Sequence, residues 1–186
     1  MFDLREIGDK HVWANHLEPL GSGDHTKEDF QTWWERNNGE LNHLPQNLVE
    51  QWIYRHWKQS IASFVPIKTL TCREEKWPPK DCIDKVGTIR GNEPLNPEDD
   101  FKMFCKKTNE GKLSPTAEAL NQGQWDFPLV VLETPDGFID KIGEHITTDY
   151  FLVEGHKRRR YLNALINKSI SITDQPVLIL NSPCFS

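Results

Sequence analysis

A run of basic residues directly after a glycine is the feature of this sequence with the clearest chemical potential. Residues 150–153 (YFLV) predict a buried strand, and the sequence EGHKRRR at 154–160 follows it at once. We expect a helix to begin within a residue or two of Gly155, so that unpaired backbone N–H groups and the helix dipole attract an anion there. The glycine has no side chain to block a phosphate, and the cations that follow it add full charges. The sequence therefore predicts a phosphate site formed by Gly155, His156, Lys157 and Arg158.

In a helix, the side chains of this basic run would point in different directions. Four consecutive cations span more than one helical turn, so they cannot all face one ligand. A solvated helical face is the alternative interpretation of such a run. In a chain whose net charge is -6, a local basic cluster instead favours a polyanion as its partner. We predict that DNA contacts Lys157, Arg159 and Arg160.

The same segment offers groups for hydrolysis of a phosphodiester or of a nucleotide phosphate. Such hydrolysis needs charge stabilisation and an activated water molecule. Arg158 is the predicted charge stabiliser. His156 can act as a general base or donate a hydrogen bond to phosphate, because the ordinary pKa of histidine is about 6.5. Glu154 lies at the mouth of the predicted pocket. The predicted catalytic residues are Glu154, His156 and Arg158.

A metal ion, if the reaction uses one, would be magnesium held by carboxylates. The candidate ligands are Glu154, Asp149 and Glu144. For Asp149 and Glu144 the alternative is an ordinary surface residue or helix cap. The four cysteines are far apart and form no pair at zinc-ligand spacing, so we expect reduced and mostly buried thiols.

The amino-terminal third predicts helices. Its first 24 residues read as a loosely held arm that ends in a turn. Thr26, followed three residues later by Asp29, is close to a capping box and predicts a helix from Phe30. Pro45 predicts the start of a second helix, which we expect to pack on the main sheet. The residues at helical spacing on its apolar face are Leu48, Val49, Trp52, Ile53, His56 and Trp57.

The rest of the chain mixes strand and helix patterns, which indicates an α+β fold. The loop 90–93 (RGNE) is a further candidate, in which Arg90 reaches a phosphate or, as the favoured alternative, forms part of a structural turn. Turn and capping signals divide the predicted elements. We predict strands over 63–71, 127–133, 150–153 and 177–180, a short helix over 80–86, and helices that open at Asn96 and Ser114.

The order of these segments resembles the ParB/sulfiredoxin superfamily. In that family a strand, a helical middle and a proline-initiated strand precede a second strand that leads into a Gly-x-x-Arg phosphate-binding box. Residues 155–158 (GHKR) match the box, and the resemblance covers residues 63–168. It implies a mixed sheet with flanking helices over 63–186, preceded by a helical amino-terminal extension over 1–62.

Departures from the family pattern narrow the function. Sulfiredoxins carry a reactive cysteine inside the box, where this chain has His156 and no nearby cysteine. Partitioning ParB proteins continue past the box into a helix-turn-helix region, for which too few residues follow here. The chain resembles a stand-alone member of the superfamily, similar in size and acidity to the Osa-type plasmid fertility-inhibition proteins. That resemblance implies a nucleotide-binding protein with ATPase and DNase activity that blocks conjugative or T-DNA transfer, the effect called oncogenic suppression.

The resemblance also implies ligands and a cellular setting. The implied ligands are ATP, with or without Mg²⁺, and DNA, and the implied protein partner is a component of a type IV secretion or conjugation system. The start of the chain has no basic and apolar leader, and no apolar run reaches the roughly 18 residues of a membrane helix, so we expect a cytoplasmic protein without a membrane span. Two alternatives remain. One is a non-enzymatic inhibitor or immunity protein whose acidic surface binds a protein partner, and the other is a small-molecule kinase of the same fold.

Overall fold

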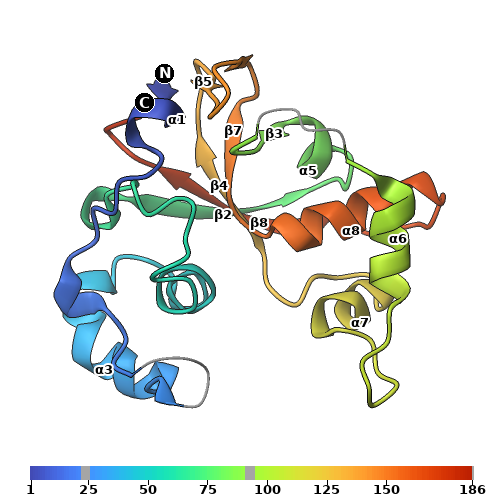
Figure 1. The fold of residues 1–186 in the computed structure, drawn as a ribbon, viewed down its shortest axis with the longest axis horizontal. Coiled ribbons are helices and arrows are strands. Elements are labelled where there is room, and N and C mark those ends of the chain that lie inside the picture. Colours follow the sequence, from blue (N-terminus) through green and yellow to red (C-terminus); the bar gives the residue numbers. More distant parts are fainter. Residues whose placement is uncertain (22–25, 91–94, 186) are drawn as a thin grey trace.

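A five-stranded mixed sheet between two helical layers forms the centre of the molecule (Figure 1). The computed structural model describes residues 1–21, 26–90 and 95–185. The arrangement confirms the predicted α+β class. In spatial order the strands are β2 (Thr71–Trp77), β8 (Gln175–Asn181), β4 (Leu129–Glu133), β7 (Tyr150–Glu154) and β3 (Val86–Gly87).

Strand β7 lies deep in this sheet and leads directly into the basic segment. It pairs antiparallel with β4 on one side and parallel with β3 on the other. Strand β8 is parallel to β4 and antiparallel to β2, which forms one edge. The predicted strands at 127–133, 150–153 and 177–180 are therefore confirmed, with shifts of a few residues at their ends.

One face of the sheet is covered by helices that follow strand β2 in the chain. They are α5 (Asp81–Asp84), α6 (Pro97–Cys105), α7 (Pro115–Asn121) and α8 (His156–Asn167). The predicted helix starts at Asn96 and Ser114 are confirmed, because their side chains accept hydrogen bonds from the backbone N–H groups of Asp99 and Ala117. Tyr161 and Leu162 of α8 pack with sheet residues in the core of this layer. In the described part of the chain, no helix combines the length and apolar character that crossing a bilayer requires.

The amino-terminal segment forms the layer on the other face of the sheet. It contains α3 (Phe30–Leu41), α4 (Gln46–Leu48) and the π-helical segment η2 (Val49–Tyr54). Both predicted helices are present, with two differences. The N-cap of α3 is Asp29 rather than Thr26, because its carboxylate accepts a hydrogen bond from the backbone N–H of Thr32 at 3.0 Å. The second helix continues from Val49 with π-helical rather than α-helical spacing.

The first residues of the chain are not the loose arm that the sequence predicts. Strand β1 (Phe2–Asp3) pairs with β5 (Phe138–Ile139), which pairs in turn with β6 (His145–Ile146) to make a small second sheet. The Phe2 ring stacks on Phe138 with 5.5 Å between centroids. Two short helices follow, α1 (Leu4–Ile7) and η1 (Asn15–Leu17). Aromatic packing therefore holds this segment, while the predicted turn at 21–24 falls mostly outside the described residues.

The predicted strand over 63–71 is wrong. Residues there form turns and the 3₁₀ helix η3 (Ile67–Thr69), and the strand β2 begins only at Thr71. Val65 and Ile67 are buried in the core of the amino-terminal layer, which explains their apolar character without a strand. That core joins residues from both sides of position 62, and the predicted domain boundary there stays a prediction.

The cysteines form no disulfide. Cys82 is buried, and burial raises the pKa of its thiol to about 12. Burial likewise raises the pKa of the half-buried Cys72 to about 11. Cys105 and Cys184 are exposed, so the expectation of mostly buried thiols is wrong for these two.

Candidate functional site

The junction between β7 and α8 is made by Gly155. It has φ +104°, in the left-handed region that favours glycine, and α8 begins at the next residue as predicted. A Cβ atom at this position would lie 2.4 Å from Cδ2 of Leu129 on strand β4. Backbone conformation and packing therefore both require a glycine here. The additional role of Gly155 in the approach of a phosphate stays a prediction.

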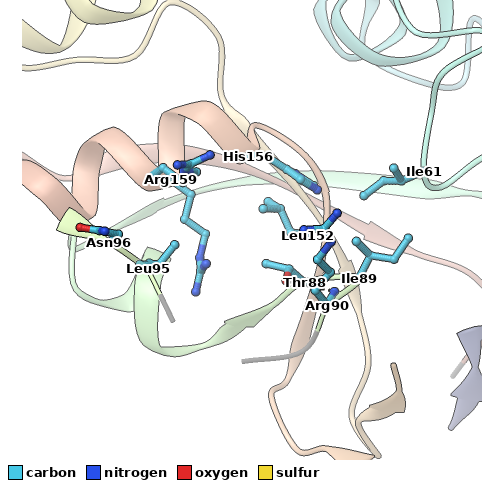
Figure 2. A pocket seen from close by; sticks show the side chains of 10 residues that line it. Ile61, Thr88, Ile89, Arg90, Leu95, Asn96, Leu152, His156 and Arg159 are labelled. Carbon is cyan, nitrogen blue, oxygen red and sulfur yellow. Dashed lines mark hydrogen bonds between the residues drawn. The ribbon is translucent and has the colours of Figure 1, made fainter. Parts of the chain in front are cut away.

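The first turn of α8 faces a cavity of about 510 Å³ with one side only (Figure 2). His156, Arg159 and Arg160 line the cavity, because helical spacing brings residues three and four positions apart onto one face. Arg158 and Lys157 do not line it. The other lining residues are Ile61, Thr88, Ile89, Arg90, Leu95, Asn96 and Leu152.

Arg158 lies on the opposite side of the helix, where carboxylates neutralise it. Its Nε donates a hydrogen bond of 2.8 Å to the carboxylate of Asp126, and its Nη1 lies 3.5 Å from that of Glu154. The Arg158 side chain is only 9% exposed. Burial alone would raise the pKa of Asp126, but the hydrogen bond and charge of Arg158, with a hydrogen bond from Thr116, lower it below its usual value. Arg158 therefore has its counter-charges within the protein.

Arg159 faces the cavity and has no such counter-charge. Its Nε donates to the carbonyl of Cys82 at 3.3 Å, and its Nη2 donates to those of Ile83 and Val86 at 2.8 and 2.9 Å. Among the residues that the structure describes, no carboxylate pairs with this guanidinium, and its Nη1 makes no hydrogen bond. Burial lowers the pKa of Arg159, which shows that the environment disfavours its charge. The three carbonyls fix the guanidinium in place without neutralising its charge, and the more distant Asp84 has only a minor opposing effect on its pKa.

His156 contributes an imidazole without hydrogen bonds. Both ring nitrogens are buried, and neither has a partner among the described residues. Burial lowers the pKa of His156, and the charges of Arg159 and Arg160 lower it further, against an opposing effect of Glu154. The ring is therefore neutral at pH 7. The Glu154 carboxylate lies 3.7 Å from Nε2 of His56 in the amino-terminal layer, and thus belongs to the Arg158 side of the helix.

The remaining cations of the predicted site have different surroundings. Arg160 donates from Nε to the carboxylate of Asp100 at 2.8 Å, which ties α8 to α6. The side chain of Lys157 is exposed, and its Nζ lies 5.3 Å from the centroid of the Tyr161 ring. Arg90 lies in a turn after β3, as the favoured sequence interpretation has it, and also lines the cavity. Its contact with a phosphate stays a prediction, and the rest of that loop, 91–93, lies outside the described residues.

The three candidate magnesium ligands lie in separate places. Glu154 ends β7, and Asp149 directly precedes the opposite end of the same strand. Glu144 belongs to the turn between β5 and β6, where its carbonyl accepts a hydrogen bond from the backbone N–H of Asp140. Within the described ranges, no three His, Cys, Asp or Glu side chains are grouped so that they could hold a metal ion. Magnesium at this site would therefore depend on oxygen ligands supplied by a bound phosphate.

The structure thus brings together part of the predicted site and adds to it. His156, Arg159 and Arg160 share the cavity, whereas Glu154 and Arg158 lie behind the same helical turn. The sequence predicted Arg159 as a DNA contact and did not place it at this cavity. Counting helical positions from the glycine would have placed it on the same face as His156. Among the other lining residues, Arg90 was a sequence candidate and Asn96 was predicted only as a helix start. Ile61, Thr88, Ile89 and Leu95 had no sequence signal, because they come from distant segments.

Comparisons with known proteins add no relative. A scan against protein-family models, a search of curated proteins and a search of solved structures each found no match to this chain. The ParB/sulfiredoxin resemblance therefore depends on the residues of the box and on the order of the elements around it. The function proposed below is based on the residues that line the cavity.

Proposed function

We propose that the protein binds the phosphate groups of a nucleotide in the cavity at the start of α8 and hydrolyses phosphate bonds there. The observation that carries this proposal is the guanidinium of Arg159. Three backbone carbonyls hold it at the cavity wall, and no carboxylate in the described part of the chain neutralises it. A fixed cation beside the amino terminus of a 12-residue helix favours an anion, because the charge and the helix dipole act in the same direction.

The size and lining of the cavity suit one mononucleotide. Small-molecule sites usually enclose about 300 to 1,000 Å³, and this cavity is within that range. Ile61, Ile89, Leu95 and Leu152 provide apolar surface for a base and ribose, while the arginines provide donors for phosphate oxygens. ATP is the proposed ligand. Mg²⁺ would arrive coordinated mainly by its phosphates, as is usual for this ion.

The chemistry proposed for this site uses the two faces of the helix differently. On the cavity side, Arg159 and the backbone N–H groups stabilise charge on the phosphate, and His156 is the catalytic group. On the other side, Arg158 and Glu154 position the turn. Lys157 and Arg160, whose side chains reach solvent, supply contacts for the backbone of DNA.

The wider function follows from the resemblance stated above. A stand-alone ParB/sulfiredoxin-like protein with ATPase and DNase activity would act in the cytoplasm on DNA that is being transferred. Its target would be DNA or a component of the conjugation or type IV secretion system. The support for this is the strand, glycine and basic helix order of β7 and α8, together with the cavity beside them.

A second candidate function has one observation in its favour. At the other end of β7, a cleft of about 330 Å³ is lined by Glu133, Pro135, Asp149, Tyr150 and Asn181. Asp149 and the aromatic ring of Tyr150 suit a basic side chain of a protein partner, whereas Glu133 is already paired with Arg73 at 2.7 Å. A non-enzymatic inhibitor that binds a basic partner would use this end of the molecule instead of the arginine-lined cavity.

The direct test is nucleotide binding by matched variants of the α8 helix. Isothermal titration with ATP and CTP is expected to show binding to the wild-type protein and a loss of about tenfold or more in Arg159→Gln, since a charge-assisted hydrogen bond contributes about 1.5–3 kcal/mol. Lys157→Ala removes the same charge two residues away, outside the cavity, and is expected to bind like the wild type. Equal affinity in all three proteins, or no binding at millimolar nucleotide, would show that the cavity is not a nucleotide site. Assays of ATP and plasmid DNA turnover then test hydrolysis.

A further inference from the structure

The imidazole of His156 is in an unusual state for a buried polar group. Buried polar side chains nearly always have a hydrogen-bond partner, and those without one call for an explanation. Both ring nitrogens of His156 are buried and unpartnered within the described residues, although the residue lines the arginine-rich cavity. The group that completes this site must therefore come from outside the part of the chain that is described, and the cavity is the route by which it would come.

The surroundings of His156 determine what the ring can do. Because the pKa of His156 is lowered, the neutral ring predominates and one nitrogen carries an available lone pair. The nearby charges of Arg159 and Arg160 disfavour a second proton on the ring, so they oppose its action as a general base. The same charges favour a product in which the ring bears a phosphoryl group, because that group is anionic. Glu154 has the opposite effect on the proton, so attack on phosphorus is favoured mainly by the position of the unpartnered ring nitrogens at the arginine-lined cavity.

We propose that His156 is a nucleophile that takes a phosphoryl group from the bound nucleotide, so that hydrolysis proceeds through a phosphohistidine. This inference rests on the proposed function and adds the identity of the reacting atom. Reaching the phosphorus takes a rotation of the side chain about its Cα–Cβ bond, into the cavity that it already lines. Arg159, which lines the same cavity and is held there by backbone carbonyls, would hold the phosphate oxygens during the transfer.

The reaction consists of phosphoryl transfer to His156 and hydrolysis of the resulting phosphohistidine. In the first, the lone pair of a ring nitrogen forms a bond to the γ-phosphorus, the bond from that phosphorus to the β,γ-bridging oxygen breaks, and ADP leaves with the electron pair. The other ring nitrogen then releases its proton to solvent. In the second step, a water oxygen attacks the same phosphorus, the N–P bond breaks, and the ring regains a proton as inorganic phosphate leaves.

The first experiment detects the intermediate. The full-length protein is mixed with γ-labelled ATP and quenched rapidly in alkali, because phosphohistidine survives alkali and is lost in acid. We expect acid-labile label, up to one phosphoryl group per chain, which mass spectrometry of the wild-type protein places on His156. The other six histidines of the chain are internal controls, so the assignment needs no variant. Acid-labile label at one of those six instead would overturn the proposal.

The second experiment follows stereochemistry and does not need the intermediate to accumulate. Hydrolysis of ATP made chiral at the γ-phosphorus is expected to give phosphate with net retention of configuration, since two displacements occur. Net inversion would show that water attacks the γ-phosphorus directly. It would overturn the nucleophilic role of His156 and leave the proposed hydrolysis intact.

Potassium phosphoramidate tests the nucleophilicity of His156 independently of nucleotide binding, because this reagent phosphorylates imidazoles without any nucleotide. If phosphoramidate labels His156 in a protein that does not bind ATP, the nucleophilic role of His156 is supported and a nucleotide is excluded as the phosphoryl donor. No labelling by either reagent, in a protein that binds no ATP, would overturn both. The His156→Gln variant, which keeps a polar side chain of similar size, is expected to lose the label and to retain ATP binding.

Discussion

Arg158 and Arg159 are neighbours in the sequence and have opposite surroundings in the fold. Arg158 is held by the carboxylates of Asp126 and Glu154 on the side of α8 that faces away from the cavity. Arg159 is held by three backbone carbonyls at the cavity wall and lacks a carboxylate partner within the described residues. Carbonyl oxygens satisfy the hydrogen bonds of a guanidinium without neutralising its charge.

The difference teaches which cation of a basic run is available to a ligand. An arginine between carboxylates contributes to folding, and removing it leaves partly buried carboxylates without their cation. An arginine fixed by neutral acceptors has a net charge that attracts an anion and is already oriented to bind it. The helical period assigns these two roles to adjacent positions.

The largest expected effect is a loss of stability on the side of α8 where carboxylates neutralise Arg158. Arg158→Met is expected to lower the free energy of unfolding by about 3 kcal/mol, because it leaves Asp126 and Glu154 without their cation. Urea denaturation measures this loss. In the protein that remains folded, ATP affinity is expected to stay within about threefold of the wild type, since Arg158 does not line the cavity.

A double variant serves as the control for this loss. Arg158→Met with Asp126→Asn is expected to recover part of the stability, because the uncompensated carboxylate is removed. A folded Arg158→Met protein that has lost its ATP affinity would contradict the division of roles between the two arginines.

The next effect concerns the glycine that turns the chain into α8. Gly155→Ala is expected to lower the free energy of unfolding by about 2 kcal/mol, from left-handed backbone strain and the close approach of Leu129. Gly123→Ala is the matched control: its φ is +84°, but a Cβ there would meet only Oγ1 of Thr173, at an ordinary contact distance of 4.0 Å, so a loss of about 1 kcal/mol is expected. Equal losses in the two variants would show that packing against Leu129 contributes nothing.

A smaller effect on stability is expected on the cavity side. Arg159→Gln is expected to lower the free energy of unfolding by about 1.5 kcal/mol, because the amide of glutamine replaces only some of the three hydrogen bonds to carbonyls, while no carboxylate among the described residues is left unpaired. Its main effect is on ATP affinity. A stability loss as large as that of Arg158→Met would mean that Arg159 is a structural cation as well.

The smallest expected effect is a change in the pH dependence of the free energy of unfolding when His156 is replaced. The pKa of His156 is lowered in the folded protein, so below about pH 6.5 the unfolded chain binds more protons than the folded one. The stability linked to His156 is fully present above that pH and is lost as the pH falls through the folded pKa. Urea denaturation at several pH values below about pH 6.5 should show a shallower decline in His156→Gln than in the wild type. An equal decline would contradict a buried, neutral ring. The lowered pKa of Asp126 acts only at more acidic pH, so the two contributions are separable.

The sequence predicts elements best where local signals and burial agree. The apolar run at β4, the caps at Asn96 and Ser114, and the β7–glycine–α8 junction were all predicted, because each has a local physical cause. The strand β2 was missed because it is an edge strand whose exposed residues are mostly charged, and so lacks an apolar alternation. The buried apolar residues near 65–67 were read as strand although tertiary packing, not a ladder, holds them.

The site shows the same limit. Its anion-binding character follows from a glycine and basic residues at a helix start, which the sequence displays. Which arginine is neutralised depends on Asp126 and on the carbonyls of residues 82–86, which are distant in sequence. Only the fold brings these partners to the helix, so sequence spacing could not distinguish Arg158 from Arg159.

A crystal structure with a non-hydrolysable ATP analogue tests the central claim most directly. The account predicts phosphate oxygens within about 3 Å of Nη1 of Arg159, in the cavity that His156 lines, with the Arg158–Asp126 pair intact. Phosphates bound on the Arg158 side of the helix, with that pair broken, would contradict it.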